Sequence, residues 1–338
     1  MKARAVFFGC SGFEVTPDER KFFRDADPLG FILFSRNCQN PQQMQALTAQ
    51  LRDCVGRADA PVLIDQEGGR VQRMKAPHWR SRPAARRFAE LYAEDPERAV
   101  RLTYLNARAM AQDLLDAGVT VDCAPVLDVP VEGAHDVIGD RAFGTRVPQI
   151  VALGRAQMRG LLDGGVLPVI KHIPGHGRAR SDSHLELPVV DTSAAELSAT
   201  DFAPFRHFAD APFAMTAHVV YTALDASAPA TTSARVIGEI IRGLIGYDGC
   251  LMTDDLSMRA LSGDFARRAE ASIQAGCDMV LHCNGQMSEM MAVAAGAPML
   301  SGDALRRTTA ALAQRKAPKP ADYLAIEAEL AQAFGAQV

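Results

Sequence analysis

The sequence predicts an α/β fold, a single (β/α)8 barrel of the TIM type, and three observations lead to it. The chain has 338 residues, of which 48% are hydrophobic, and that is enough for one large core. Eight short apolar runs alternate with segments of helical pattern. The runs are nearly continuous, which is typical of parallel strands buried on both faces. An open doubly wound sheet is the main alternative, but the residues Gly9-Cys10-Ser11-Gly12 after the first run lack its Gly-x-Gly-x-x-Gly motif.

The expected strands are spaced through most of the chain. They cover residues 5–8, 30–34, 62–65, 120–126, 167–171, 213–218, 250–253 and 278–282. Each run is bounded by polar residues, glycine or proline, so each is expected to be one short strand of the barrel wall.

Several of the intervening helices carry sequence signals at their ends. Asn40-Pro41 and Asp95-Pro96 each place an N-cap residue before a proline at the first helical position, and Val147-Pro148 opens a third helix. Residues 234–245 and 265–274 predict two more helices, which end close to glycines. Beyond about residue 287 the pattern is helical to the end. We therefore expect residues 1–338 to form one domain, with C-terminal helices at about 287–338 packed on the barrel.

Composition excludes several classes of protein. The formal net charge is −4, and no basic run or basic amphipathic helix indicates binding to nucleic acid or to a membrane surface. The apolar runs are shorter than the ~18–20 residues of a membrane-spanning helix. The N-terminal apolar run, residues 5–8, is too short for a signal peptide. The seven cysteines are scattered, without a Cys-x-x-Cys pair. We expect a cytoplasmic protein, a monomer, that binds neither nucleic acid nor a membrane.

Polar residues follow six of the eight expected strands. In a barrel of this kind, the C-terminal ends of the strands meet at one rim, where the chemistry takes place. Any one of these residues could be structural, but together they predict a functional site at that rim. They are Asp65, Asp128, Lys171 with His172, His218, Asp254 with Asp255, and Asn284.

The segment after the fifth strand carries most of the titratable groups. Residues 171–177 hold two glycines and a proline, so this stretch is a loop rather than a strand or a helix. Asp182 and His184 lie two positions apart, which in an extended loop puts both side chains on one face. The carboxylate could then hold the imidazole in one tautomer for proton transfer, although a surface histidine near an aspartate is the simpler alternative. His176 could be a ligand or a substrate contact, but a structural role in holding the loop is favoured.

Asp254 follows a buried strand, which would hold its carboxylate rigidly, as a nucleophile requires. The alternative is that Asp254 or Asp255 caps a helix starting at Leu256, a role that suits Asp255 better. A metal-dependent hydrolase on this barrel usually has His-x-His at the end of the first strand, where this chain has Cys10-Ser11-Gly12. No metal and no other cofactor is therefore expected.

Six ordered motifs give the chain a recognisable signature. It resembles glycoside hydrolase family 3, and more narrowly the single-domain bacterial β-N-acetylglucosaminidases of peptidoglycan recycling. The resemblance covers residues 30 to 285, which is most of the chain. The motifs are GFILF at residues 30–34 followed by Arg36-Asn37, DQEGGRVQR at 65–73, APVLDV at 124–129, KHIPGHG at 171–177, DSH at 182–184 and TDDLSM at 253–258.

The resemblance implies a role for each candidate residue. Asp254 would be the nucleophile of a retaining mechanism, and His184 the general acid/base, oriented by Asp182. A His–Asp pair in place of the usual second carboxyl group characterises this subgroup. The implied sugar-binding residues are Asp65, Arg73, Arg141, Lys171 and His172. Asp128 and Glu67 are expected to support the site. We expect neither the second α/β domain nor the fibronectin-like domain of larger members in this protein, which agrees with an acid/base on the loop.

The resemblance further implies the reaction. The expected enzyme removes terminal GlcNAc from GlcNAc-1,6-anhydro-N-acetylmuramic acid and its peptides, small muropeptide substrates. Two alternatives stay open. One is a family 3 phosphorylase, because a histidine does not repel an incoming phosphate as a glutamate would. The other is a non-catalytic sugar-binding barrel.

Overall fold

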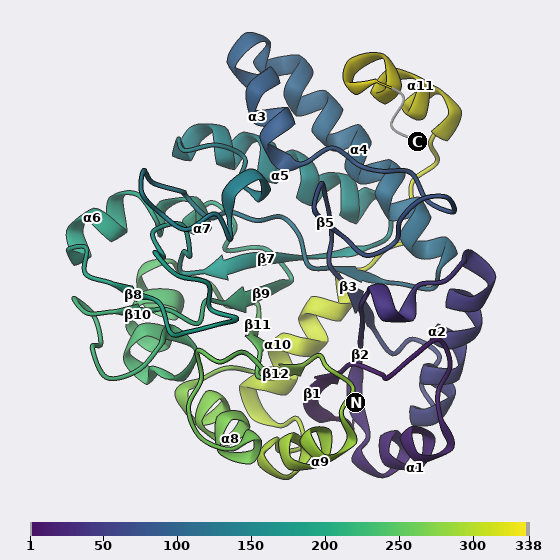
Figure 1. The fold of residues 1–338 in the computed structure, drawn as a ribbon, viewed down its shortest axis with the longest axis vertical. Helices are drawn as coiled ribbons and strands as arrows, with labels where there is room; N and C mark the ends of the chain where they lie inside the picture. Colours follow the sequence, from purple (N-terminus) through teal and green to yellow (C-terminus); the bar gives the residue numbers. More distant parts are fainter. Residues whose placement is uncertain (1, 336–338) are drawn as a thin grey trace.

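A computed structural model describes residues 2–335 and shows a closed barrel of eight parallel strands (Figure 1). Around the barrel the strand order is β1-β12-β11-β9-β7-β6-β3-β2. The prediction of a (β/α)8 barrel is confirmed, and each expected run contributes one strand. Their bounds are β1 Arg4–Phe8, β2 Pro28–Leu33, β3 Val62–Ile64, β6 Val121–Asp122, β7 Leu167–Ile173, β9 Phe213–Thr216, β11 Cys250–Asp255 and β12 Met279–His282.

The fourth barrel strand is shorter than expected. The run at residues 120–126 forms β6 only over Val121–Asp122, and a single bridge from Val126 to Lys171 continues the pairing. Pro125 interrupts the ladder because proline has no amide hydrogen to donate. The chain nevertheless stays hydrogen-bonded to β7 as far as Leu127, whose amide donates to the carbonyl of Lys171 at 2.8 Å, and Asp128 follows directly at the rim.

The barrel closes where β1 pairs with β12, with Phe7 opposite Leu281. Backbone hydrogen bonds to the segment after α9 (Met287–Gly296) add to this closure. The amide of Ala5 donates to the carbonyl of Pro298 at 2.8 Å, and the amide of Leu300 donates to the carbonyl of Ala3. Segments from the two ends of the chain thus complete the wall together.

Helices surround the barrel (Figure 1). The expected N-caps Asn40 and Asp95 accept hydrogen bonds from the first turns of their helices, and Gly276 ends α8 in a left-handed conformation. The helix expected at 234–245 is present as η4, which has π-type hydrogen bonding. The main helices are α1 Pro17–Ala26, α2 Pro41–Val55, α3 Ala85–Glu94, α4 Pro96–Asp116, α5 Val147–Asp163, η4 Val236–Leu244 and α8 Phe265–Ala275.

The C-terminal segment is not helical throughout, so that expectation was wrong in part. It forms α9 Met287–Gly296, α10 Gly302–Ala313 and α11 Tyr323–Phe334, and residues 336–338 lie outside the described part. Prolines lie in both interruptions, and a proline disfavours helix at the residue before it. α11 lies against α4, where Arg101 pairs with Glu329 at 2.8 Å.

Short excursions from the rim were not predicted. A two-stranded antiparallel hairpin, β4 Gln66–Gly68 with β5 Val71–Gln72, directly follows β3. Gly68 ends β4 and Gly69 begins the turn, with φ of 96° and 57°, a region that favours glycine. A second pair joins β8 Val189–Val190 to β10 Val220–Tyr221, beside the short helices α6 Ala194–Ala199 and α7 Ala203–Arg206.

The inside of the barrel is a packed core rather than a channel. Large side chains such as Phe7, Leu63 and Phe213 are fully buried there, each worth ~1.5–3 kcal/mol in hydrophobic free energy. Polar groups that must meet solvent are therefore left to the rim. Within residues 2–335, no helix combines the length and the apolar character needed to cross a membrane.

Candidate active site

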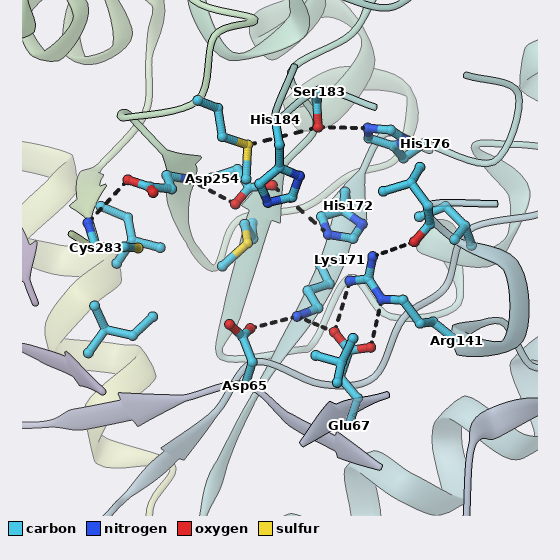
Figure 2. Close-up of a pocket in the computed structure, with 18 of the residues that line it drawn as sticks. Asp65, Glu67, Arg141, Lys171, His172, His176, Ser183, His184, Asp254 and Cys283 are labelled. Atoms are coloured by element: carbon cyan, nitrogen blue, oxygen red, sulfur yellow. Dashed lines mark hydrogen bonds and ion pairs between the residues drawn. The ribbon is translucent and has the colours of Figure 1, made fainter. Parts of the chain in front are cut away.

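A pocket of about 140 Å³ opens at the C-terminal ends of the barrel strands (Figure 2). Of the eight residues to which the resemblance gives a catalytic or sugar-binding role, all except Asp182 line it, and Asp182 contacts the lining residue His184. The sequence thus identified residues that the fold gathers in one place. The polar and charged lining residues are Asp65, Glu67, Arg73, Arg141, Lys171, His172, His176, Ser183, His184, Asp254 and Asp255.

One side of the pocket is a chain of alternating charges (Figure 2). Lys171 Nζ lies 2.9 Å from Asp65 Oδ1 and 2.6 Å from Glu67 Oε1. Arg73 holds the other oxygen of Asp65 at 3.0 Å, and Arg141 binds Glu67 through two parallel hydrogen bonds of 2.8 and 2.9 Å. Each buried charge is therefore paired, as burial requires.

The pairing fixes the protonation states of these groups. Burial alone would raise the pKa of Asp65, but the neighbouring Lys171 and Arg73 outweigh it and hold that pKa far below its usual range. For Glu67, burial is likewise outweighed by Arg141 and Lys171, which lower the pKa to about 2. Lys171 keeps its proton, because the two carboxylates raise its pKa against the effect of burial. The carboxylates can therefore accept, and the cations donate, hydrogen bonds with sugar hydroxyls.

The other side of the pocket holds Asp254 at the end of β11. Its side chain is 12% exposed, and His172 Nε2 lies 4.0 Å from its Oδ2. The amide of Asp255 donates to its Oδ1 at 2.8 Å. Burial opposes ionisation of Asp254, but His172, His218 and that amide prevail and lower its pKa. The result is a rigid, ionised carboxylate that faces the pocket.

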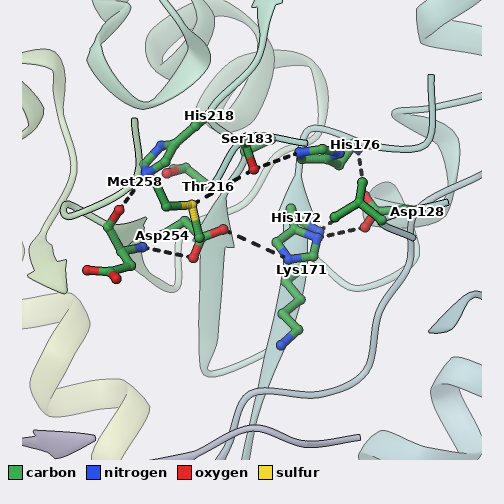
Figure 3. Close-up of polar contacts among 12 residues, drawn as sticks. Asp128, Lys171, His172, His176, Ser183, Thr216, His218, Asp254 and Met258 are labelled. Carbon is green, nitrogen blue, oxygen red and sulfur yellow. Dashed lines mark hydrogen bonds and ion pairs between the residues drawn. The ribbon is translucent and has the colours of Figure 1, made fainter. Parts of the chain in front are cut away.

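The imidazole of His172 contacts Asp128 on the side away from Asp254 (Figure 3). Its Nδ1 lies 2.7 Å from Asp128 Oδ2, and Asp128 also accepts the backbone amides of His172 and His176 at 3.2 and 2.6 Å. Because Asp128 is fully buried and acidic, the imidazole Nδ1 carries a hydrogen and Nε2 points to the pocket. The expectation that Asp128 braces the site fits this arrangement.

His184 stands on the loop that follows β7. Its Nδ1 lies 2.7 Å from Asp182 Oδ1, and the same oxygen accepts its backbone amide at 2.9 Å. Partial burial of Asp182 is outweighed by these two hydrogen bonds, which lower the pKa of its carboxyl. The imidazole is 60% exposed, and Figure 2 shows it projecting toward the part of the pocket that holds Asp254. The dyad thus leaves Nε2 available for proton transfer.

Two other residues predicted at the rim have structural contacts. Asp255 does not cap a helix at Leu256, because residues 256–260 form turns and α8 begins only at Phe265. Instead, Asp255 Oδ1 accepts the amides of Ser257 at 3.0 Å and Cys283 at 3.1 Å. Asn284 lies beyond β12 and its side chain donates to Glu289, so it does not line the pocket.

His218 lies behind Asp254 (Figure 3). It is fully buried, with Nδ1 2.7 Å from Thr231 Oγ1 and Nε2 3.1 Å from the carbonyl of Asp255. Burial lowers its pKa despite the opposing effect of Asp254, so the ring is neutral. His218 fixes the backbone beside Asp254 instead of reaching the pocket.

Three features of the site were missed at the level of sequence. Phe34 directly follows β2 and lines the pocket. The guanidinium carbon of Arg73 lies over the ring of Phe34, 5.0 Å from the ring centroid. Met258 and Cys283 also line the pocket. The motif GFILF contained Phe34, but its contact with Arg73 depends on the fold. No cluster of three or more potential metal ligands occurs within residues 2–335.

Comparison with known proteins places this geometry in a family. The model of the glycosyl hydrolase family 3 N-terminal domain matches residues 12–307. The chain belongs to glycoside hydrolase family 3. It is a glycoside hydrolase, as the resemblance of its motifs had indicated.

Relatives named β-hexosaminidase match most of the chain. A protein of Alkalilimnicola ehrlichii named β-hexosaminidase is 43% identical over 283 residues, which is 82% of this chain and 80% of the relative. A β-hexosaminidase of Bordetella avium is 40% identical over 285 residues, with the same shares. Among solved structures, NagZ from Neisseria gonorrhoeae in complex with N-trifluoroacetyl-D-glucosamine superimposes with a TM-score of 0.84 at 31% identity, covering 100% of this chain and 96% of NagZ.

Proposed function

We propose that the protein is a retaining exo-β-N-acetylglucosaminidase. Asp254 is the nucleophile and His184 the general acid/base, oriented by Asp182. The observation that carries this proposal is the pairing of a buried, ionised carboxylate with an exposed His–Asp dyad at one pocket. A non-catalytic sugar-binding barrel has no use for a dyad that aims a free imidazole nitrogen at a leaving group.

The opposite wall of the pocket binds the terminal sugar. Asp65 accepts from hydroxyl groups, whereas Arg73, Arg141 and Lys171 donate to hydroxyls or to the N-acetyl carbonyl, and His172 Nε2 faces the same sugar. Ion pairs hold each of these side chains in place before substrate arrives, so little side-chain entropy is lost on binding. The similarity to β-hexosaminidases and to a NagZ bound to an N-acylglucosamine supports an N-acetylated sugar in this position.

The reaction proceeds in two displacements. A carboxylate oxygen of Asp254 attacks the anomeric carbon while the glycosidic C–O bond breaks, and His184 donates its proton to the leaving oxygen. Water then attacks the anomeric carbon of the glycosyl ester. His184 takes the proton from this water as the bond to Asp254 breaks, which restores both groups and retains the β configuration.

The substrates proposed are GlcNAc-1,6-anhydro-N-acetylmuramic acid and its peptides, so the enzyme would act in peptidoglycan recycling. The similarity to NagZ supports this choice. We further propose a cytoplasmic monomer. The seven cysteines are free thiols, as is usual in a reducing compartment. Light scattering of the purified protein tests the oligomeric state.

The first test is release of p-nitrophenol from its β-N-acetylglucosaminide in phosphate-free buffer with EDTA. Turnover is expected under these conditions. Incubation of the Asp254→Asn variant with the same substrate is the control, since it keeps the shape of the side chain without its charge. Wild-type turnover that the variant fully retains would refute the assignment of the nucleophile.

Phosphorolysis is the second candidate, because His184 takes the place of a glutamate that would repel phosphate. Adding phosphate to the assay and separating the products decides between the two reactions. Free GlcNAc in the presence of phosphate supports hydrolysis, and GlcNAc-1-phosphate supports phosphorolysis.

A further inference from the structure

Ser183 lies between the two residues of the dyad but differs from both in exposure. It is 3% exposed, whereas the imidazole of His184 is 60% exposed. Its hydroxyl points inward, with Oγ 3.3 Å from His176 Nε2 and 3.8 Å from Met258 Sδ (Figure 3). A buried hydroxyl that meets two partners from different segments is an anchor point in an otherwise exposed loop.

The backbone of Ser183 makes a third contact. Its carbonyl accepts the amide of Ala260 at 3.2 Å. Met258 and Ala260 belong to the turns that directly follow Asp254 and β11. Ser183 thus joins the loop of the acid/base to the segment of the nucleophile.

His176 connects the same hydroxyl to the base of the site. Its amide donates to Asp128 Oδ1, and Asp128 Oδ2 holds His172, which lies beside Asp254. Burial and the neighbouring His172 lower the pKa of His176 to about 4, so its ring is neutral near pH 7. With the hydroxyl donating to the sulfur of Met258, Nε2 of His176 is the donor to Ser183.

The contacts of Ser183 carry the hydrogen bonding between the dyad segment, residues 180–187, and its surroundings. Among the described residues, every hydrogen bond from residues 180–187 to the rest of the chain involves Ser183. The hydrogen bond between Asp182 and His184 is internal to the segment, so it sets the tautomer of the imidazole but not its position over the pocket.

We propose that Ser183 is a positioning residue, a latch whose buried hydroxyl holds His184 over the pocket and in register with Asp254. The proposal rests on the proposed function, because it assumes that His184 protonates the leaving group. Without the latch, the dyad stays intact but spends less time within reach of the glycosidic oxygen. Loss of position then affects the steps that need proton transfer and spares those that do not.

The experiment compares Ser183→Ala with wild type on two aryl β-N-acetylglucosaminides. The phenyl glycoside needs protonation of its leaving group, and the 2,4-dinitrophenyl glycoside does not. The value of kcat/KM reports the first displacement for both. We expect Ser183→Ala to lower kcat/KM about fivefold for the phenyl glycoside, the effect of losing one neutral hydrogen bond, and less than twofold for the dinitrophenyl glycoside.

Four further variants extend this comparison. Ser181→Ala removes a hydroxyl from a half-buried position of the same loop and should leave both rates unchanged. Ser183→Thr keeps the hydroxyl and should recover most of the loss. His176→Phe removes the hydrogen-bond partner of Ser183, so it should lower kcat/KM for the phenyl glycoside as Ser183→Ala does. The double variant should lose no more kcat/KM than either single variant, because both substitutions break the same contact.

Equal losses on the two glycosides, no loss on the phenyl glycoside, or losses that multiply in the double variant would each overturn the latch. His184→Ala separates this from failure of the proposed function. If wild type turns over neither glycoside, or if His184→Ala loses activity equally on both, the assignment of the acid/base fails. A selective loss in His184→Ala without one in Ser183→Ala refutes the latch alone.

Discussion

The substitution Glu67→Gln tests whether the charged wall of the pocket depends on one bridging carboxylate. Glu67 lies between two cations and accepts Lys171 at 2.6 Å and Arg141 at 2.8 and 2.9 Å, with 7% of its side chain exposed. Glutamine keeps the shape but removes the charge, and its amide nitrogen faces a cationic donor. Two buried cations are then left short of a counter-ion, which is costly.

The size of the effect follows from the pKa of Glu67. Folding lowers this pKa from 4.5 to about 2, and the difference corresponds to about 3 kcal/mol of stability near pH 7. For a chain of 338 residues, a loss of about 3 kcal/mol lowers the melting temperature by about 4 °C. We also expect KM to rise, because Lys171 and Arg141 lose their fixed positions around the sugar.

The pH dependence supplies a sharper signature. Because the pKa is depressed in the folded state, the stabilisation is fully present above the unfolded value of 4.5 and is lost as the pH falls toward 2. Differential scanning calorimetry of both proteins should therefore show a gap in melting temperature at pH 7 that narrows between pH 5 and 3.

Glu90→Gln is the matched control. Its partner Arg87 lies 3.2 Å away, but both side chains are more than half exposed, so this change should shift the melting temperature by less than about 1 °C. If Glu67→Gln melts as the wild type does at pH 7, or if the gap is constant with pH, the bridging role assigned to Glu67 is wrong.

Three further outcomes are expected at the site. Asp254→Asn should lower kcat at least about 10⁴-fold without unfolding the protein, because the ester cannot form; circular dichroism and single-turnover assays check both points. His184→Ala should lower kcat/KM about 10²–10³-fold for a phenyl leaving group but far less for dinitrophenyl, and a uniform loss would contradict its role as an acid. Arg141→Lys keeps the charge, but lysine cannot bind Glu67 through two parallel hydrogen bonds. KM should therefore rise about tenfold with a smaller change in kcat, as measured from initial rates over a range of substrate concentrations. An unchanged KM would show that Arg141 is not part of the sugar site.

The barrel could be predicted because its strands are short, nearly continuous apolar runs. Such runs indicate strands buried on both faces, and they can be recognised from the local sequence alone. Features that depend on contacts with residues far along the chain could not be predicted in this way. Thr16 and Glu19 form a capping box at the start of α1, a local signal that was overlooked. The hairpin of β4 and β5 was hidden because its residues are polar and serve the pocket rather than a core.

The candidate site shows the same division. The positions of Asp65, Lys171 and Asp254 at strand ends followed from the barrel, since parallel strands end at one rim. That Glu67 bridges two cations, and that Ser183 is buried between two exposed residues, depends on contacts between loops from different strands. Sequence spacing alone does not encode such contacts.

The closure of the barrel between β1 and β12 sets the order in which a growing chain can complete its fold. At ribosomal rates, about 15–60 seconds separate the synthesis of β1 from that of β12, and during that time one edge of β1 has no strand to pair with. Pro298 and Leu300, whose backbones form hydrogen bonds with Ala5 and Ala3, are synthesised later still. A nascent or prematurely terminated chain therefore exposes an apolar strand edge that can recruit other chains. Chaperone capture of ribosome-bound chains should persist until this last strand emerges.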